Sequence, residues 1–128
     1  MQFVDGDCGL DAAWIDRARA EFYEGNRVAV VCGRRAERCS EETMYNRLCD
    51  MEWDTPIGEA NECGGDALMD AATFRAVGGF RDDLIAGEEP ELCSRIRAQG
   101  GRVLRIDAPM TLHDARMTTL SQWWMRNV

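Results

Sequence analysis

The sequence predicts an α/β protein in which short buried strands alternate with amphipathic helices. Two observations indicate this class: apolar, β-branched runs at 27–32 and 102–106, and apolar residues at helical spacing at 11–24 and 87–100. With 128 residues, 45% of them hydrophobic, the chain is large enough to bury one core. We therefore expect a single domain covering residues 1–128.

The first half of the chain predicts two strands and two helices. Residues 2–4 are typical of the end of a buried strand, and residues 5–9 of the turn that follows it. A helix is expected over 11–24, and the continuously apolar segment 27–32 predicts a strand buried on both faces. A second helix is expected to begin at Ser40, whose hydroxyl can cap the first turn.

The second half predicts two more strands and two more helices. A strand is expected at 67–69 and a short helix at 71–77, closed by a pair of glycines. The next helix has Pro90 in its first turn, where a missing N–H is tolerated. The following segment, 102–106, alternates as a half-buried strand, which Pro109 is expected to end.

The charge balance narrows the range of partners. The chain has 23 acidic and 15 basic residues, which gives a net charge of −8. Such an acidic surface repels a phosphate backbone, so we expect no nucleic-acid partner. If the protein binds a phosphorylated ligand, a divalent cation has to stand between the carboxylates and the phosphate.

The sequence also predicts a cellular compartment. No run approaches the roughly 20 apolar residues of a membrane span, and residues 1–5 lack the basic start of a secretion signal. We therefore expect no transmembrane segment, a cytoplasmic location and reduced cysteines. Because no C-x-x-C pair is present, the six cysteines indicate neither a zinc site nor a disulfide framework.

Several carboxylates occur where they could take part in chemistry. Asp5 and Asp7 flank a glycine on a turn after a strand and could contact one cation, although Asp and Gly are also the commonest turn residues. Glu88 and Glu89 begin a helix, where acids complement the helix dipole. A carboxylate fixed at a helix start also suits a general base, and the two roles are compatible.

Residues in the last part of the chain could likewise have either a structural or a functional role. His113 is the only histidine, and a lone histidine is more often a packing or surface residue than a metal ligand. Trp123 and Trp124 favour a core or an interface over a sugar platform. None of these residues decides the function alone.

Five short blocks, taken together and in order, cover nearly the whole chain. They are F-V-D-G-D at 3–7, E-C-G-G-D at 62–66, F-R-A-V-G-G-F-R-D-D-L at 74–84, G-E-E-P-E-L-C-S-R-I-R at 87–97, and His113-Asp114. In this order they resemble the successive motifs of family 2 glycosyltransferases of the GT-A fold. The V-G-G-F followed by the G-E-E-P-E-L block is quite specific, whereas D-x-D alone is not. The resemblance implies a truncated GT-A domain, an open mixed sheet flanked by helices.

The resemblance implies a metal and donor site at the D-x-D turn. Asp7 matches the acid that coordinates Mn²⁺ or Mg²⁺ on the donor diphosphate, and Asp5 matches the acid near the donor ribose and the metal. His113 matches the histidine that in many members completes the metal shell.

The resemblance also implies an acceptor site. Gly64 and Gly65 match the loop that lines the sugar and the acceptor, with Asp66 beside it. Glu89 matches the catalytic base of inverting members, which is usually an aspartate, and Glu88 matches its acceptor-binding neighbour. The implied reaction is transfer of a sugar from a nucleotide-sugar to a hydroxyl of an acceptor sugar or lipid.

The chain corresponds to the acceptor-side half of such a domain. The nucleotide-binding half of the family would precede Asp5, and the open sheet edge left there favours a homodimer. Residues 122–126 do not match the Q-x-x-R-W motif of processive polymerases, so polymer synthesis is not indicated. Two other functions remain open: a catalytically inactive fragment acting as a dimeric interaction module, and a simple divalent-cation binder.

Overall fold

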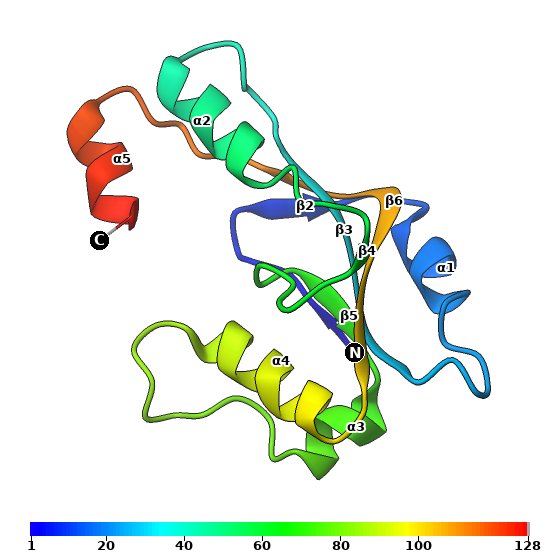
Figure 1. Ribbon diagram of the computed structural model, residues 1–128. Coiled ribbons are helices and arrows are strands. Elements are labelled where there is room, and N and C mark those ends of the chain that lie inside the picture. The colour runs from blue at the N-terminus through cyan, green and yellow to red at the C-terminus, as the bar shows by residue number, and fades with distance from the viewer. Residues whose placement is uncertain (128) are drawn as a thin grey trace.

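The computed structural model describes residues 1–127 and shows a curled, open mixed sheet surrounded by five helices (Figure 1). The strands are β1 (Gln2–Phe3), β2 (Cys8–Leu10), β3 (Val28–Glu37), β4 (Gly58–Glu59), β5 (Ala67–Met69) and β6 (Arg102–His113). The helices are α1 (Trp14–Arg19), α2 (Met44–Glu52), α3 (Ala71–Ala76), α4 (Glu88–Ala98) and α5 (Leu120–Asn127). The mixed α/β class is therefore confirmed.

The order of the strands brings several chain segments to one edge of the sheet. The order is β1-β5-β3-β6-β2, with β4 paired to β6. The two long central strands, β3 and β6, are parallel, and every other pairing is antiparallel. The carboxyl ends of β1, β3 and β6 therefore meet at the same edge, where β2 and β5 begin. In open α/β sheets, ligands bind at such carboxyl ends.

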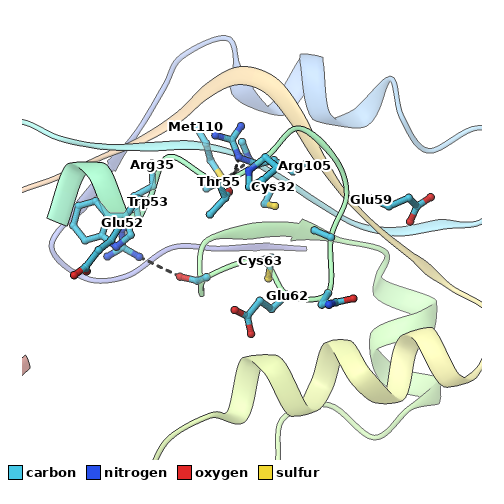
Figure 2. A pocket seen from close by; sticks show the side chains of 15 residues that line it. Cys32, Arg35, Glu52, Trp53, Thr55, Glu59, Glu62, Cys63, Arg105 and Met110 are labelled. Atoms are coloured by element: carbon cyan, nitrogen blue, oxygen red, sulfur yellow. Dashed lines mark hydrogen bonds between the residues drawn. The ribbon is translucent and has the colours of Figure 1, made fainter. Parts of the chain in front are cut away.

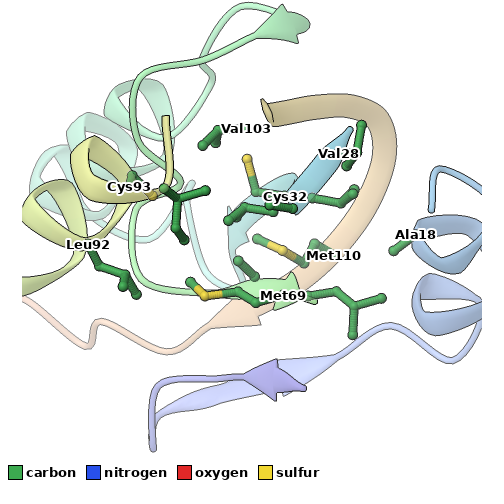
Figure 3. Packing of buried hydrophobic residues seen from close by; sticks show 14 of the residues in the cluster. Ala18, Val28, Cys32, Met69, Leu92, Cys93, Val103 and Met110 are labelled. Carbon is green, nitrogen blue, oxygen red and sulfur yellow. The ribbon is translucent and has the colours of Figure 1, made fainter. Parts of the chain in front are cut away.

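The hydrophobic core lies along the central strands. Figure 3 shows the buried side chains of the strands between α4 on one side and α1 on the other. The apolar residues of 28–32 are all buried, which confirms a strand covered on both faces. In β6, burial alternates over 102–106, which confirms the half-buried pattern expected there.

One glycine determines how α1 packs on the sheet. A Cβ atom at Gly33 would lie 2.5 Å from Cζ3 of Trp14 and 2.6 Å from the Ala108 carbonyl oxygen. The fully buried indole of Trp14 therefore needs glycine beneath it. The Nε1–H of Trp14 donates a 2.8 Å hydrogen bond to Gln2 Oε1, which also ties α1 to β1.

Both central strands are longer than expected. β3 continues past residue 32 to Glu37, and β6 runs through Pro109 to His113, so the expected break at Pro109 is wrong. The β3–β6 register shifts on both sides of the Arg34–Pro109 pair. An irregularity of this kind accommodates a proline within a sheet because no regular ladder hydrogen bond is required there.

The helices also differ from expectation at some of their ends. The expected Ser40 cap of α2 is wrong, because Thr43 accepts the Asn46 N–H at 3.1 Å and donates to the Met117 carbonyl at 2.7 Å. α1 covers only part of 11–24, whereas β5, α3 and α4 lie where they were predicted. Strands β2 and β4 and helix α5 were not expected. Within residues 1–127, no helix has both the length and the apolar composition to cross a lipid bilayer.

Candidate functional site

The two aspartates of the D-G-D turn are placed by strand pairing. Phe3 pairs with Ala67, and Cys8 pairs with His113, so the turn between β1 and β2 crosses the carboxyl edge of the sheet. The Cys8 N–H closes the turn on the Asp5 carbonyl at 3.0 Å. The side chains of Asp5 and Asp7 are about half exposed, at 52% and 54%. Both carboxylates are therefore available to a ligand from solvent.

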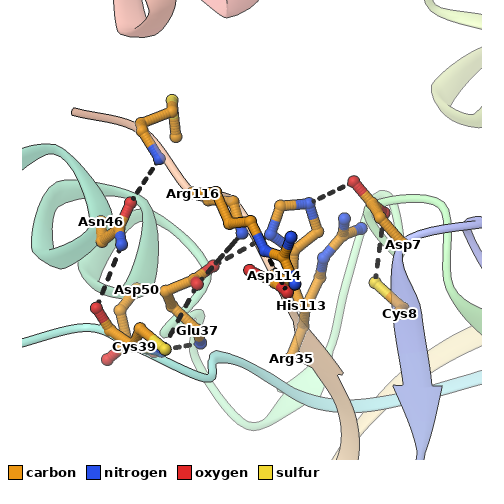
Figure 4. Close-up of polar contacts among 12 residues, drawn as sticks. Asp7, Cys8, Arg35, Glu37, Cys39, Asn46, Asp50, His113, Asp114 and Arg116 are labelled. Carbon is orange, nitrogen blue, oxygen red and sulfur yellow. Dashed lines mark hydrogen bonds and ion pairs between the residues drawn. The ribbon is translucent and has the colours of Figure 1, made fainter. Parts of the chain in front are cut away.

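His113 lies between two carboxylates (Figure 4). Its Nδ1 is 2.9 Å from Glu37 Oε2, and its Nε2 is 2.9 Å from Asp7 Oδ2. The Glu37 side chain is fully buried and also accepts the Ala115 N–H at 3.1 Å. The β3–β6 register produces this contact, because Glu37 and His113 are paired residues.

This arrangement fits a divalent cation. A neutral imidazole has one N–H, and when Nδ1–H donates to Glu37, the Nε2 lone pair faces Asp7. The lone pair and the carboxylate repel unless a proton or a cation lies between them. Neighbouring ligands of an octahedral ion at about 2.1 Å are about 3.0 Å apart, close to the 2.9 Å separation of Nε2 and Oδ2. Asp7 and His113 could thus hold Mg²⁺ or Mn²⁺, with Glu37 orienting the imidazole. We call Asp5, Asp7, Glu37 and His113 the sheet-edge site.

A buried network supports the turn from below. Asp66, whose side chain is fully buried, accepts the Asp5 N–H at 2.8 Å and the Thr111 hydroxyl at 2.7 Å. Arg35 Nη1 is 2.9 Å from Asp5 Oδ2 and 3.7 Å from Asp66 Oδ2, and it donates to the Gly64 carbonyl at 3.3 Å. Arg35 thereby balances two acids and links the D-G-D turn to the loop before β5.

The two glycines of that loop have backbone conformations that favour glycine. Gly64 and Gly65 have φ values of +77° and +99°. A Cβ atom at Gly65 would lie 3.7 Å from the Asp5 carboxylate oxygens, so this loop passes directly beside the acid. A Cβ atom there would make only an ordinary van der Waals contact, so the positive φ values, and not crowding, favour glycine at these positions.

Glu89 connects the loop that contains Gly64 to the start of α4 through hydrogen bonds. Glu89 is 8% exposed, and its Oε1 accepts hydrogen bonds from Cys63 N (2.7 Å), Cys63 Sγ (2.9 Å) and Cys93 Sγ (2.9 Å). Its Oε2 accepts the Gly64 N–H at 3.1 Å. Glu89 thus lies directly behind a loop that reaches the sheet-edge site, whereas Glu88 is exposed.

Three thiols near these sites have a raised pKa and are protonated at neutral pH. Burial raises the pKa of Cys8 to about 12 and that of Cys32 to about 12. The hydrogen bond with Cys93, together with burial, raises the pKa of Cys63 far above its ordinary range. The Cys63 thiol therefore donates to the Glu89 carboxylate.

Two adjoining pockets open on this side of the molecule. One, of about 870 Å³, is lined by Asp5, Asp7, Gly64 and His113 together with the cations Arg35 and Arg126. The other, of about 440 Å³, is shown in Figure 2 and is lined by residues of the 55–64 segment and of β3. Arg35, Trp53 and Gly64 line both, so the pockets share a wall.

The structure brings most of the predicted site residues together. Asp5, Asp7, Gly64 and His113 line one pocket, while Gly65 and Asp66 contact or support Asp5 from beside and below it. Glu88 and Glu89 do not line either of these two pockets.

Four residues of the site were not predicted from the sequence. Trp53 makes an edge contact with His113, at 4.8 Å between ring centroids. The guanidinium groups of Arg35 (4.7 Å) and Arg126 (5.1 Å) each lie over the Trp53 ring. Glu37 lies at the end of β3, in the polar half of the strand that the sequence did not predict. Arg35 shares the strand face of Glu37, two residues away.

No protein-family model and no curated protein sequence matches the chain. The fold and the site therefore define it as a class only: a mixed α/β protein with a candidate divalent-cation site at the carboxyl edge of its sheet. Any narrower assignment rests on the geometry of the site and on the motif resemblance.

Proposed function

We propose that the chain is the acceptor-side half of a metal-dependent, inverting family 2 glycosyltransferase of the GT-A fold. One observation carries the proposal. Asp5, Asp7, Gly64 and His113, which are far apart in the sequence and belong to the blocks that resemble this family, line the same open pocket. Asp7 and His113 are 2.9 Å apart, a separation that two ligands of one octahedral cation would also have.

The pocket contains the charges that a nucleotide-sugar requires. A Mg²⁺ or Mn²⁺ ion held by Asp7 and His113 would neutralise the charge that develops on the leaving diphosphate. Arg35 and Arg126 lie along the same pocket, and guanidinium groups are well suited to bind phosphate oxygens.

Glu89 is the candidate base for the acceptor hydroxyl. Two backbone N–H groups hold its carboxylate in one orientation, at the start of α4. Among the described residues, Oε2 accepts only the Gly64 N–H, which leaves it room for a second donor. In the proposed reaction, Glu89 takes the proton of the acceptor hydroxyl while the hydroxyl oxygen bonds to the anomeric carbon of the donor sugar. The bond from that carbon to the diphosphate breaks, and its electron pair leaves with the diphosphate.

Calorimetric titration of UDP-, GDP- and dTDP-sugars with Mn²⁺ tests the proposal, with and without a complementary nucleotide-binding half. We expect one donor to bind only when Mn²⁺ is present. Asp7→Asn should abolish this binding, whereas Glu89→Gln should retain binding and lose the release of nucleoside diphosphate. If no donor binds even with the complementary half supplied, the proposal is wrong.

The two other functions give different results in the same experiments. A catalytically inactive dimeric module would associate through the outer edge of β1, which is unpaired within residues 1–127. Sedimentation would then show a dimer whose contact covers Asp5 and prevents donor binding. A simple cation binder would bind Mn²⁺ in the Glu89→Gln variant, lose it in Asp7→Asn, and show no effect of any nucleotide-sugar.

A further inference from the structure

A second cluster of metal-ligating atoms lies behind the Gly64 loop. Cys63, Glu89 and Cys93 offer two sulfur atoms and one carboxylate oxygen, all within 4.8 Å of one another. Glu89 and Cys93 are one turn apart on α4, and Cys63 comes from the loop before β5. We call these residues the thiol cluster. The scattered sequence positions of the six cysteines indicated no metal site, but the fold brings these two together.

We propose that the thiol cluster binds one thiophilic divalent cation of the Zn²⁺ type through Cys63 Sγ, Cys93 Sγ and Glu89 Oε1. In a tetrahedral site with Zn–S bonds of about 2.3 Å, two sulfur ligands are about 3.8 Å apart. The two sulfur atoms are already 3.9 Å apart. The sulfur–oxygen separations of 2.9 Å are those of S–H···O hydrogen bonds. They would open to about 3.5 Å when the metal replaces the two thiol protons, which pass to solvent.

The surroundings of the cluster also suit a metal. The N–H groups of Cys63 and Gly64 hold the Glu89 carboxylate in place, as outer-shell donors do in metal sites. Glu89 and Cys93 are buried, while Cys63 is partly buried and lines the 440 Å³ pocket (Figure 2). This pocket provides an entry path and leaves the fourth ligand position to water.

Ligand chemistry separates this site from the sheet-edge site. Thiolates favour Zn²⁺ and similar soft ions, whereas an aspartate–histidine pair with open positions also accepts Mg²⁺ or Mn²⁺. The consequence for activity, which rests on the proposed function, is inhibition. Zn²⁺ in the thiol cluster would occupy Glu89 Oε1 and hold the candidate base away from the acceptor, while Mn²⁺ at Asp7 supports the reaction.

Titration of the fully reduced chain with Co²⁺ and then Zn²⁺ tests the site without any sugar substrate. We expect one equivalent of Co²⁺ to give a thiolate-to-cobalt charge-transfer band, which Zn²⁺ abolishes. Cys63→Ser and Cys93→Ser should each weaken binding by about 100-fold, because each removes one of the two thiolate ligands. Cys39→Ser is the matched control, and Asp7→Asn removes only the sheet-edge site; both should keep the band. If no metal binds at Asp7, the result of this Co²⁺ titration is therefore unchanged.

Alkylation of the unmodified chain gives a second measurement that does not depend on folding of the variants. Zn²⁺ should protect Cys63, the cluster thiol that lines the pocket, from prolonged iodoacetamide labelling and leave the labelling of the other cysteines unchanged. The proposal is overturned if the band persists in both cluster variants, if it is lost in Cys39→Ser, or if Zn²⁺ does not protect Cys63. It is also overturned if the protection comes from a Cys63–Cys93 disulfide formed by mild oxidation rather than from the metal.

Discussion

The sheet-edge site and the thiol cluster both contain carboxylates, but in opposite surroundings. The Asp7 side chain is 54% exposed and has an imidazole nitrogen 2.9 Å away. Glu89 is 8% exposed and accepts four hydrogen bonds from the Cys63–Gly64 loop and Cys93. An exposed carboxylate with few partners is available for a ligand, whereas a buried carboxylate with many donors is needed to hold its loop in place.

Because of this difference, substitutions at Asp7 and at Glu89 should differ in their effects on the stability of the fold and on function. Removing the Asp7 charge should affect binding and leave the fold intact, because water can solvate whatever replaces it. Removal of the Glu89 charge should affect both the fold and the proposed proton transfer, because Glu89 is buried and accepts four hydrogen bonds.

The largest effect on stability is therefore expected for Glu89→Gln, compared with the matched amide substitution at Asp7. In Glu89→Gln, the side-chain NH₂ has to face a donor, the Gly64 N–H if Oε1 keeps its three partners, so one hydrogen bond to a charged acceptor is lost and the other three lose their charge assistance. We expect the free energy of unfolding to fall by about 3 kcal/mol. The matched Asp7→Asn variant should change it by less than about 0.5 kcal/mol. Urea unfolding measures both, and equal losses would contradict the distinction drawn between the two regions.

The next effect concerns the link between Glu37 and His113. In Glu37→Gln the side chain can still accept a hydrogen bond from His113, but it no longer carries the charge that makes the imidazole a better ligand. We expect Mn²⁺ affinity to fall by about 10- to 100-fold, as for other outer-shell changes. Electron paramagnetic resonance of free Mn²⁺ measures this. Glu41→Gln, an exposed acid on the loop after β3, is the control and should bind as the unmodified chain does.

The local parts of the fold could be predicted from the sequence. β5, α3 and α4 depend on short signals: an apolar triplet after two glycines, a closing pair of glycines, and a proline in a first turn. The polar residues Arg34 and Arg35 hid the second half of β3, because charged residues usually end a buried strand. Here Arg35 stays in the strand since its charge is balanced by Asp5 and Asp66. Such long-range pairing has no local signal.

The same limit explains which parts of the sites were missed. The D-G-D turn and His113 were detectable because turn acids and a single histidine stand out in a sequence. Glu37 and Arg35 join them only through the β3–β6 register, which connects residues 76 positions apart. Cys63 and Cys93 likewise meet only after the loop before β5 folds onto α4. Residue type indicates candidate ligands, but long-range pairing decides which of them meet.

The last and smallest effect concerns Asp70, a carboxylate outside both regions that serves as a reference. It is the N-cap of α3 and accepts 2.8 Å hydrogen bonds from the Thr73 N–H and hydroxyl, which lower its pKa below the ordinary 3.8. Asp70→Ala should lower the free energy of unfolding by about 1 kcal/mol at neutral pH. Asp70→Asn, which keeps the cap acceptor, should lose only a few tenths.

The pH dependence of this effect follows from the sign of the shift. Because the folded pKa is lower than the unfolded one, the contribution of Asp70 is fully present above the unfolded value of 3.8 and is lost as the pH falls through the folded value. The stability difference between the unmodified chain and Asp70→Ala should therefore be constant above about pH 4 and shrink as the pH falls below it. Urea unfolding across that range measures it. A difference that stays constant would mean that the Thr73 hydrogen bonds do not depend on the Asp70 charge. The stability effects of Asp7, Asp70 and Glu89 could then not be ranked by the hydrogen bonds that each carboxylate accepts.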